Sequence, residues 1–414
     1  MLKKLPYTDL NGIEQNFQTL YGEITDFQKN RYHALFERFK SEFGFDKGYI
    51  ASSSGRVEVC GNHTDHNGGK VVSCAISLDT LAVFMPTDDN VITIKSEGYP
   101  EIKVDINGEA TEKIGTSPAL VRGVAVGVKN FGYKVGGFSA CFTSNVLGGA
   151  GISSSASFEV LVAEILNFLY NDGVIDNENK SKIAQFSENV YFGKPCGLLD
   201  QTAIAFGGLK LLDFKDKNSI KVKNIENDLK DYTIILINTG GSHAGLTDEY
   251  AAIPNEMFSV ASAMGEDRLI DVGKDNFNKK LPEFYSKLSD RAVLRAIHFF
   301  EENDRVDSLY NALQNEDYST FLNMVNQSGK SSLYKLQNCF VAGRSEQPIP
   351  KALALCERFL HGGANRVHGG GFAGSILNIV KNDNKEYFIE QAKKYFSSES
   401  IIPLKVRSVG TIVL

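Results

Sequence analysis

The sequence has no tryptophan, six cysteines and ten prolines among 414 residues. It also lacks any apolar run near the ~20 residues that a membrane-spanning helix needs. No two cysteines form a C-x-x-C pair, and the first residues lack the apolar stretch of a secretory signal. We therefore expect reduced, mostly buried thiols in a cytoplasmic protein.

A surplus of basic residues is also missing, because 44 lysines and arginines stand against 50 aspartates and glutamates, a net charge of −6. Broad nucleic-acid binding needs a basic surface, so we expect no nucleic-acid partner. No basic cluster indicates a membrane-binding patch either. Small-molecule chemistry fits this composition better, and a small basic pocket for a phosphate is still allowed.

The apolar pattern is that of a globular protein of two or three domains, at ~100–200 residues per domain. Strands and helices are mingled without strict alternation, which favours an α+β fold over a doubly wound parallel sheet. We place the domain boundary at 214/215, which gives domains 1–214 and 215–414. The pattern predicts helices at 26–43, 118–130, after the loop 148–155, at 180–192, 198–206, 286–303, 305–315, 317–326 and 384–396, and strands at 70–77, 81–86, 91–95, 102–106, 138–145, 209–214, 233–238, 375–380 and 410–414.

The strongest chemical signal is a glycine-serine loop at 145–156, NVLGGAGISSSA. A strand, this loop and a helix in sequence predict a phosphate cradle, because glycines permit close backbone approach and helix amino-terminal amides favour an anion. The alternative is a flexible linker or a simple helix cap. It is not the common P-loop, because Gly329-Lys330-Ser331 has Met324 where that motif needs a glycine.

Two further glycine clusters surround polar residues. Residues 369–374, GGGFAG, satisfy G-x-G-x-x-G, but a strand follows them where a dinucleotide site requires a helix, so we interpret them as a tight turn. Residues 55–69, GRVEVCGNHTDHNGG, have the density of donors and acceptors that suits a sugar. His63, Asp65 and His66 alternatively suggest a metal, although the setting of H-E-x-x-H is absent.

Taken together, these segments resemble the galactokinases, within the GHMP family of small-molecule kinases. Residues 55–69 resemble the galactokinase signature G-R-V-N-x-I-G-E-H-T-D-Y-N-G-G, and residues 147–160 resemble the family's phosphate loop. Residues 196–201, CGLLDQ, are similar to C-G-I-M-D-Q, and residues 369–374 to G-G-G-F-G-G. The order and spacing agree from about residue 50 to 380.

The resemblance implies a two-domain GHMP kinase fold. The amino-terminal domain would resemble the second domain of a ribosomal small-subunit protein, and the carboxy-terminal domain would be ferredoxin-like. It also implies ATP-dependent phosphorylation of the anomeric hydroxyl of α-D-galactose in the cleft between them.

The resemblance also places roles on residues. Asp200 would accept the proton of the attacking hydroxyl, and Arg56 would favour the ionised aspartate and stabilise developing charge. Sugar contacts would come from Asn62, His63, Asp65, Gly197 and Tyr250. ATP would be held by Gly148, Gly149, Ala150, Gly151, Ser153, Ser154 and Ser155, and Mg²⁺ by Ser154 and Glu188.

Each of these residues also has an ordinary structural interpretation. Asp200 and Glu188 could be solvated helix carboxylates, Arg56 a structural ion pair and Tyr250 a packed side chain. The adenine pocket is not assigned, and we expect a monomer.

Several positions depart from the family pattern. Asn62 replaces a glutamate that lies towards the sixth carbon of the sugar, which predicts either galactose or a sugar altered at that carbon. Glu58 replaces Asn, His66 replaces Tyr, Leu147 replaces Pro, His368 and Ala373 depart in the last glycine motif, and Gly241–Ala244 lacks basic residues. Galacturonic acid, an amino sugar or arabinose are therefore alternative acceptors, and a non-catalytic sugar- and ATP-binding regulator is an alternative function.

Overall fold

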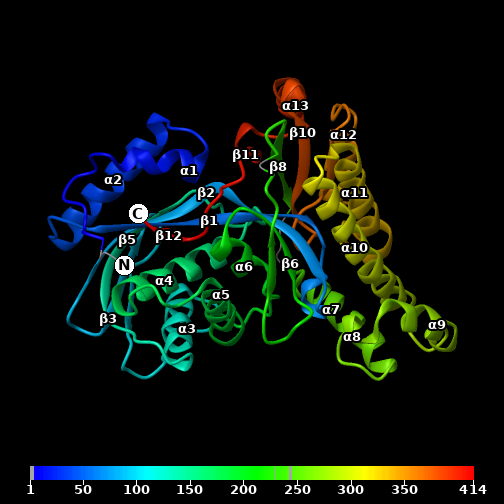
Figure 1. The fold of residues 1–414 in the computed structure, drawn as a ribbon, viewed down its shortest axis with the longest axis horizontal. Coiled ribbons are helices and arrows are strands. Elements are labelled where there is room, and N and C mark those ends of the chain that lie inside the picture. Colours follow the sequence, from blue (N-terminus) through cyan, green and yellow to red (C-terminus); the bar gives the residue numbers. More distant parts are fainter. Residues whose placement is uncertain (1–3, 228, 242–244) are drawn as a thin grey trace.

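The computed structural model describes residues 4–227, 229–241 and 245–414, and Ser242–Ala244 of the departing segment lie outside them. The chain builds two sheets that stand next to each other (Figure 1). The first sheet has eight strands in the order β12-β1-β2-β5-β3-β4, with β6 pairing with β2 and β7 with β6. Its strands are β1 (Tyr49–Cys60), β2 (Lys70–Pro86), β3 (Val91–Ser96), β4 (Ile102–Asp105), β5 (Phe138–Ser144), β6 (Leu209–Asp213), β7 (Lys221–Asn224) and β12 (Ile412–Val413).

Helices cover both faces of the first sheet. The apolar sides of α3 (Ser117–Asn130) and α4 (Ser154–Tyr170) pack on one face, with α5 (Asn177–Phe186) and α6 (Leu199–Phe206) beside them. The short helix α1 (Phe17–Tyr21) and α2 (Asp26–Phe43) pack on the other face. The sequence sets the limits of α2 locally: Thr25 and Gln28 form a capping box, and Gly44 ends the helix with a φ of 73°.

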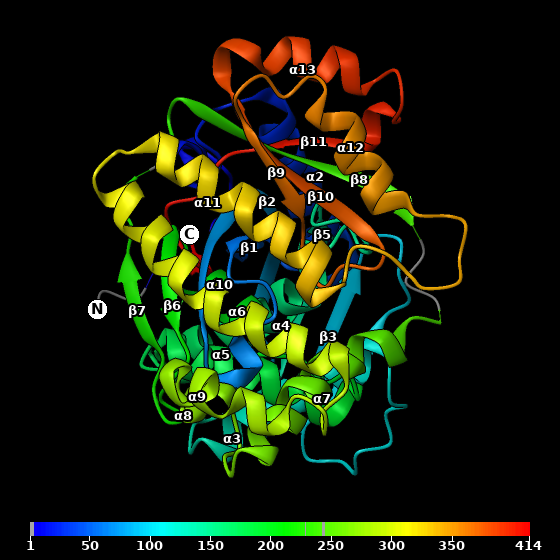
Figure 2. The ribbon, with the colours of Figure 1, turned by 90° about the vertical axis from the view of Figure 1, so that its right-hand side faces the viewer.

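The second sheet has the order β11-β8-β10-β9 and is antiparallel throughout. The helices α10 and α11 form a long layer beside it (Figure 2). Its strands are β8 (Tyr232–Gly241), β9 (Ala364–Val367), β10 (Gly374–Lys381) and β11 (Ile401–Leu404), and the helices of this half are α7 (Thr247–Ala263), α8 (Leu269–Val272), α9 (Lys274–Phe284), α10 (Asp290–Gln314), α11 (Tyr318–Ser331), α12 (Pro348–Glu357) and α13 (Lys385–Ala392).

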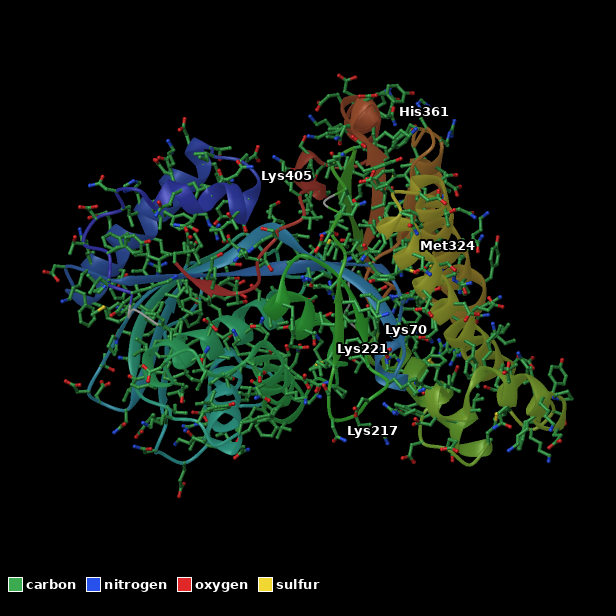
Figure 3. The ribbon with its side chains drawn as sticks, in the orientation of Figure 1. Lys70, Lys217, Lys221, Met324, His361 and Lys405 are labelled. Atoms are coloured by element: carbon green, nitrogen blue, oxygen red, sulfur yellow. The ribbon has the colours of Figure 1, made fainter. Side chains whose placement is uncertain are left out.

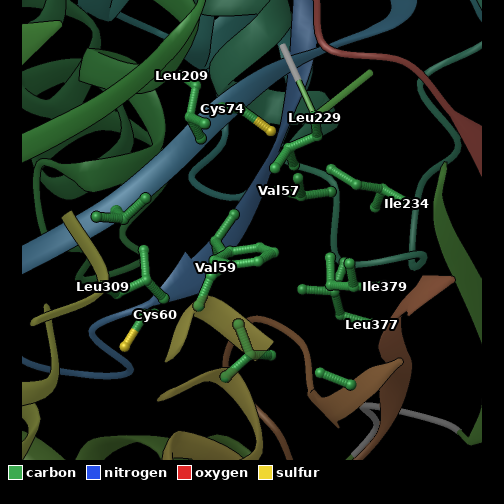
Figure 4. Packing of buried hydrophobic residues seen from close by; sticks show 14 of the residues in the cluster. Val57, Val59, Cys60, Cys74, Leu209, Leu229, Ile234, Leu309, Leu377 and Ile379 are labelled. Carbon is green, nitrogen blue, oxygen red and sulfur yellow. The ribbon is translucent and has the colours of Figure 1, made fainter. Parts of the chain in front are cut away.

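A shared hydrophobic core joins the two halves (Figure 4). Val57 and Val59 of β1 are buried with Leu377 and Ile379 of β10 and with Leu309 of α10. Burial of side chains of this kind contributes roughly 1.5–3 kcal/mol each, so the core fixes how the two sheets meet. The loops that end β1 and precede β10 are thereby brought together.

The predicted elements are confirmed with a few corrections. The strands expected at 70–77 and 81–86 are one strand, β2. Asp79 between them does not break the strand, because it is buried, accepts a hydrogen bond from the Tyr21 hydroxyl at 2.7 Å and forms an ion pair with Arg31. The helices expected at 286–303 and 305–315 are one helix, α10, because Asn303 and Asp304 at the expected break both have partners: Asn303 donates to the Phe299 carbonyl oxygen at 2.8 Å, and Asp304 pairs with Lys274.

Two further differences concern the site. The helix expected at 180–192 is α5 followed by a π-helical turn, Ser187–Phe192. Residues 55–60, for which the sequence also allowed a polar, solvated hairpin, belong to the buried strand β1. Beyond the expected domain boundary, β7 and β12 return to the first sheet. None of the helices in the described parts of the chain has the length and apolar content needed to span a bilayer.

Candidate active site

The centre of the site is an ion pair between Arg56 on β1 and Asp200 in the first turn of α6. Nε and Nη2 of Arg56 lie 2.8 and 2.7 Å from Oδ1 of Asp200, and Nη1 donates to the carbonyl oxygen of Gly151 at 2.5 Å. The hydroxyl of Ser153 donates to the other oxygen, Oδ2. The Arg56 side chain is only 6% exposed, whereas that of Asp200 is 32% exposed. A carboxylate that is fixed on one side and open on the other can accept a proton from a ligand.

The glycine-serine loop runs between β5 and α4, next to this ion pair. Gly149, Gly151 and Ser153 have φ values of 79°, 74° and 65°. The left-handed conformation is uncommon for a non-glycine residue such as Ser153, and it coincides here with the hydroxyl contact to Asp200. The loop leads into the 17-residue helix α4. Its backbone amides therefore start a long helix, which is the arrangement that favours phosphate.

A second carboxylate, Glu188, lies behind the loop and is 2% exposed. Its Oε1 accepts hydrogen bonds from Ser155 and Lys194, each at 2.9 Å, and its Oε2 accepts one from Gln201 at 2.9 Å. The predicted partner Ser154 is the first residue of α4, but the observed contact is made by Ser155.

Glu159 is a third carboxylate in this region, and sequence reasoning missed it. It is fully buried, and neither of its oxygens has a hydrogen-bond partner in the described parts of the chain. Burial, with a further contribution from Glu188, raises the pKa of Glu159 well above its ordinary value. Its place within residues 147–160, which resemble the family's phosphate loop, was the sequence signal that could have found it.

The sugar signature forms the turn after β1. Nε2 of His63 lies 3.0 Å from the carbonyl oxygen of Gly370, and burial lowers the pKa of His63 to about 3, so its ring is neutral. Oδ1 of Asp65 lies 3.2 Å from Nδ1 of His66. The Asp65 carboxylate packs closely on Gly197, because a β-carbon built at Gly197 would lie 1.7 Å from Oδ2 of Asp65.

A cavity of about 300 Å³ opens beside this contact. Asp65, His66, Cys196 and Gly197 line it together with the segment that connects β6 and β7, where Lys217 is labelled in Figure 3. Arg56 and Asp200 do not line it. Tyr250 of α7 approaches from the other half of the chain and donates a hydrogen bond to the carbonyl oxygen of Gly371 at 2.8 Å.

Asn62 occupies a different environment, because it is completely buried. Its Nδ2 donates to Oε1 of Glu58 at 3.0 Å and to the carbonyl oxygen of Gly369 at 2.9 Å. Its Oδ1 accepts hydrogen bonds from Asn338 at 2.8 Å and from Ser332 at 3.2 Å. The structure thus brings Asn62 against the last glycine motif.

Helix α10 supports the same turn through two residues that sequence reasoning also missed. Oε1 of Glu302 accepts hydrogen bonds from the backbone N–H of Gly61 at 2.9 Å and of Asn62 at 3.4 Å. Nε2 of His298 lies 2.9 Å from the Asn62 carbonyl oxygen. His298 and Glu302 are four positions apart and therefore lie on the same face of the predicted helix, which was the available signal.

The metal alternative for His63, Asp65 and His66 gains no support. Within residues 4–227, 229–241 and 245–414, no three His, Cys, Asp or Glu side chains are grouped so that they could hold a metal ion. The ring centroids of His63 and His66 are 5.8 Å apart.

Comparison with known proteins agrees with this geometry. Residues 37–86 match the galactokinase galactose-binding signature, and residues 119–208 match the GHMP kinases N terminal domain. The galactokinase of Limosilactobacillus fermentum is 30% identical over 362 residues, which cover 85% of this chain and 90% of the relative. The galactokinase of Clostridium tetani is 29% identical over 348 residues, 83% of this chain and 87% of the relative.

Solved structures show the same fold. A crystal structure of Lactococcus lactis galactokinase complexed with galactose has a TM-score of 0.80 at 24% identity and covers 93% of this chain and 100% of its own. Methanococcus jannaschii mevalonate kinase has a TM-score of 0.61 at 15% identity, with 86% and 98% covered. From the identity to its relatives over most of its length, and from its mixed α+β GHMP kinase fold, this chain belongs to the galactokinase family and is a sugar kinase.

Proposed function

We propose that the chain transfers the γ-phosphoryl group of ATP to the anomeric hydroxyl of α-D-galactose, with Asp200 as the base. The single observation that carries this is the Arg56–Asp200 pair beside the glycine-serine loop. The anomeric O–H gives its proton to Asp200, and its oxygen attacks the γ-phosphorus in line. The bond from that phosphorus to the β,γ-bridging oxygen breaks, so that ADP leaves with the bond's electron pair. No covalent enzyme intermediate is needed.

Arg56 has two roles in this proposal. It fixes Asp200 through Oδ1, and its contact with the Gly151 carbonyl joins the base to the loop that would hold the phosphates. A guanidinium at this place also stabilises negative charge that develops on the transferred group. The backbone amides and hydroxyls of residues 148–155 would bind the ATP phosphates.

We further propose that Ser154 and Glu188 hold Mg²⁺. The carboxylate of Glu188 is buried beside the glycine-serine loop, where the Ser155 hydroxyl and Lys194 contact it. A carboxylate and serine hydroxyls at this place are the oxygen ligands that a hard divalent cation prefers. Mg²⁺ supplies charge neutralisation for the phosphates when it is bound.

For the sugar, we propose contacts from His63, Asp65, Gly197 and Tyr250. A neutral imidazole, a carboxylate, a backbone amide and a phenol give the mixture of donors and acceptors that sugar hydroxyls need. Asn62 lies in the same turn between β1 and β2, residues 61–69, which we call the sugar-binding turn. The choice of galactose as the substrate is based on the similarity to galactokinases, whereas the residues of the turn support binding of a sugar in general.

The finer expectations from the sequence belong to the same proposal. They are a ribosomal-protein-like amino-terminal domain over 1–214, a ferredoxin-like carboxy-terminal domain over 215–414, a monomer, and a cytoplasmic location without nucleic-acid or membrane partners. The antiparallel four-stranded second sheet supports the ferredoxin-like assignment.

The test is release of ADP from Mg-ATP with galactose, galacturonic acid, galactosamine, N-acetylgalactosamine, arabinose and glucose, followed by location of the phosphate in the product. We expect galactose to be best and the phosphate to be on the anomeric oxygen. A higher rate with another sugar would show that this sugar is the substrate. Binding of sugar and ATP without turnover would show that the chain is a sugar- and ATP-binding regulator.

A further inference from the structure

We propose that Glu58 and Asn62 form an exchanged carboxylate–amide pair that positions the sugar-binding turn, and that Asn62 does not itself contact the sugar. The inference rests on the proposed function, because it concerns how the same site recognises its sugar. The family signature has an amide at the first of these positions and a carboxylate at the second, whereas this chain has them the other way round.

The first step is that the hydrogen-bonding capacity of Asn62 is filled by the protein. An amide side chain has two N–H donors and two lone pairs on its oxygen. Its donors go to Glu58 and Gly369, and its oxygen accepts from Asn338 and Ser332. A sugar hydroxyl could bind to Asn62 only by displacing one of these buried partners, which would leave that partner unsatisfied.

The second step is that the carboxylate at position 58 has its own cation. Oε1 of Glu58 accepts from Nη2 of Arg366 at 2.8 Å, and the side chains of Glu58 and Arg366 are 4% and 0% exposed. Arg366 also donates to the carbonyl oxygen of Val59 at 3.1 Å. The negative charge of Glu58 therefore lies on β1, where Arg366 of β9 pairs with it, and not in the turn that follows β1.

The third step is that another departure from the family pattern belongs to the same cluster. The backbone N–H of Glu58 donates to Nε2 of His368 at 3.2 Å. Glu58, Asn62 and His368 are thus linked by hydrogen bonds, with Glu58 in the middle. Because His368 accepts from the backbone N–H of Glu58, it holds the strand on which Glu58 lies and is expected to be indifferent to the exchange of side chains at positions 58 and 62.

The cluster positions the turn through the neighbour of Asn62. While Asn62 holds the Gly369 carbonyl, His63 lies 3.0 Å from the Gly370 carbonyl. Both contacts attach the sugar-binding turn to the glycine motif that precedes β10. Asn62 is therefore a positioning residue for His63 and for the turn.

The experiment compares N62E, E58N and the double variant E58N/N62E, with the exposed substitution N30E as the control for adding a glutamate. N62E places a second carboxylate next to Glu58, where the present contact is 3.0 Å and Glu58 is already ion-paired with Arg366, and we expect kcat/KM for galactose to fall by about 100-fold or more. E58N leaves Arg366 without its carboxylate and should also be impaired. The double variant should recover to within about tenfold of the parent, whereas a double variant as impaired as N62E would overturn the pairing.

A second readout separates positioning from sugar contact. Asn62→Ser, which adds no charge, is compared with the parent on galactose and on 6-deoxygalactose, which lacks the hydroxyl on the sixth carbon. Positioning predicts that the ratio of the two kcat/KM values stays within about threefold while both values fall. A ratio that collapses towards one would show that Asn62 binds that hydroxyl and would overturn the proposal.

Folding and the proposed function are checked separately. Thermal unfolding of the parent, N62E, E58N and the double variant measures the coupling between positions 58 and 62 without any turnover, and additive changes in stability would contradict the pair. If the parent protein folds but releases no ADP with galactose, the proposed function fails while the unfolding cycle still tests the pair.

Discussion

Arg56 and Asp200 meet through a single carboxylate oxygen. Both Nε and Nη2 of Arg56 point at Oδ1, at 2.8 and 2.7 Å, while Oδ2 accepts from the Ser153 hydroxyl. The arginine therefore orients the carboxylate and leaves the second oxygen to hydroxyl donors. This division is what a base needs. Oδ2 can accept a hydrogen bond from the sugar hydroxyl, while Oδ1 keeps the orientation of the carboxylate fixed.

The first prediction concerns the base itself. Asp200→Asn keeps the size of the side chain but removes the proton acceptor, so we expect turnover to fall by about 10²–10⁴-fold. ATP binding should change little, because the amide can still bond to Arg56 and Ser153. ADP release and calorimetric ATP binding measure the two quantities. Turnover close to that of the parent would remove Asp200 as the base.

Much of the fold was predictable where periodicity is strong. Helix α2 was expected at 26–43 and is observed at Asp26–Phe43, because the apolar spacing and the Thr25 cap agree. The single strand β2 was not predictable, because Asp79 interrupts an apolar run and only long-range partners, Tyr21 and Arg31, satisfy it in the core. The same holds for β1, whose buried polar residues Arg56 and Glu58 are paired with the distant residues Asp200 and Arg366.

The candidate site was likewise predictable only in part from the sequence. The motifs located Arg56, Asp200 and the glycine-serine loop, and the structure brings these together. Motifs could not show that Glu58, Gly369, Asn338 and Ser332 fill the hydrogen-bonding capacity of the Asn62 side chain, because three of these partners lie 270 or more positions away in the sequence. The sequence suggested that Asn62 sets the sugar preference. We propose instead that Asn62 positions the sugar-binding turn.

The second prediction tests the contact between the sugar-binding turn and the loop before α6. Gly197→Ala places a β-carbon 1.7 Å from Oδ2 of Asp65, so the carboxylate must move. We expect the KM for galactose to rise by about tenfold or more, since a misplaced contact weakens sugar binding. The KM for ATP serves as the internal control and should stay within about twofold. Equal effects on both substrates would show a general distortion instead of a sugar contact.

The third prediction concerns the metal. Glu188→Gln removes the charge but keeps the side chain, so we expect the Mg²⁺ concentration for half-maximal activity to rise by about tenfold or more. Excess Mg²⁺ should restore part of the activity. Glu178→Gln on α5, which removes a surface partner of Lys182, is the matched control and should leave the Mg²⁺ dependence unchanged. The same Mg²⁺ dependence in Glu188→Gln as in the parent would exclude Glu188 from the metal site.

The last prediction uses the raised pKa of Glu159, whose main cause is burial and whose second cause is Glu188. Because its folded pKa lies above its unfolded pKa, the folded protein binds the extra proton, and stability is lost as pH rises from the unfolded towards the folded pKa. Glu159→Gln removes this titration. We therefore expect the variant to melt on the order of 2–4 °C above the parent at pH 8, with a smaller difference at pH 5.5.

Thermal unfolding at the two pH values measures this difference, and the exposed substitution Glu109→Gln is the control that should show no change between them. The pH dependence of the difference is the decisive quantity, because the cost of burying the glutamine amide is the same at both pH values. A difference in melting temperature that does not shift in favour of Glu159→Gln between pH 5.5 and pH 8 would contradict the raised pKa.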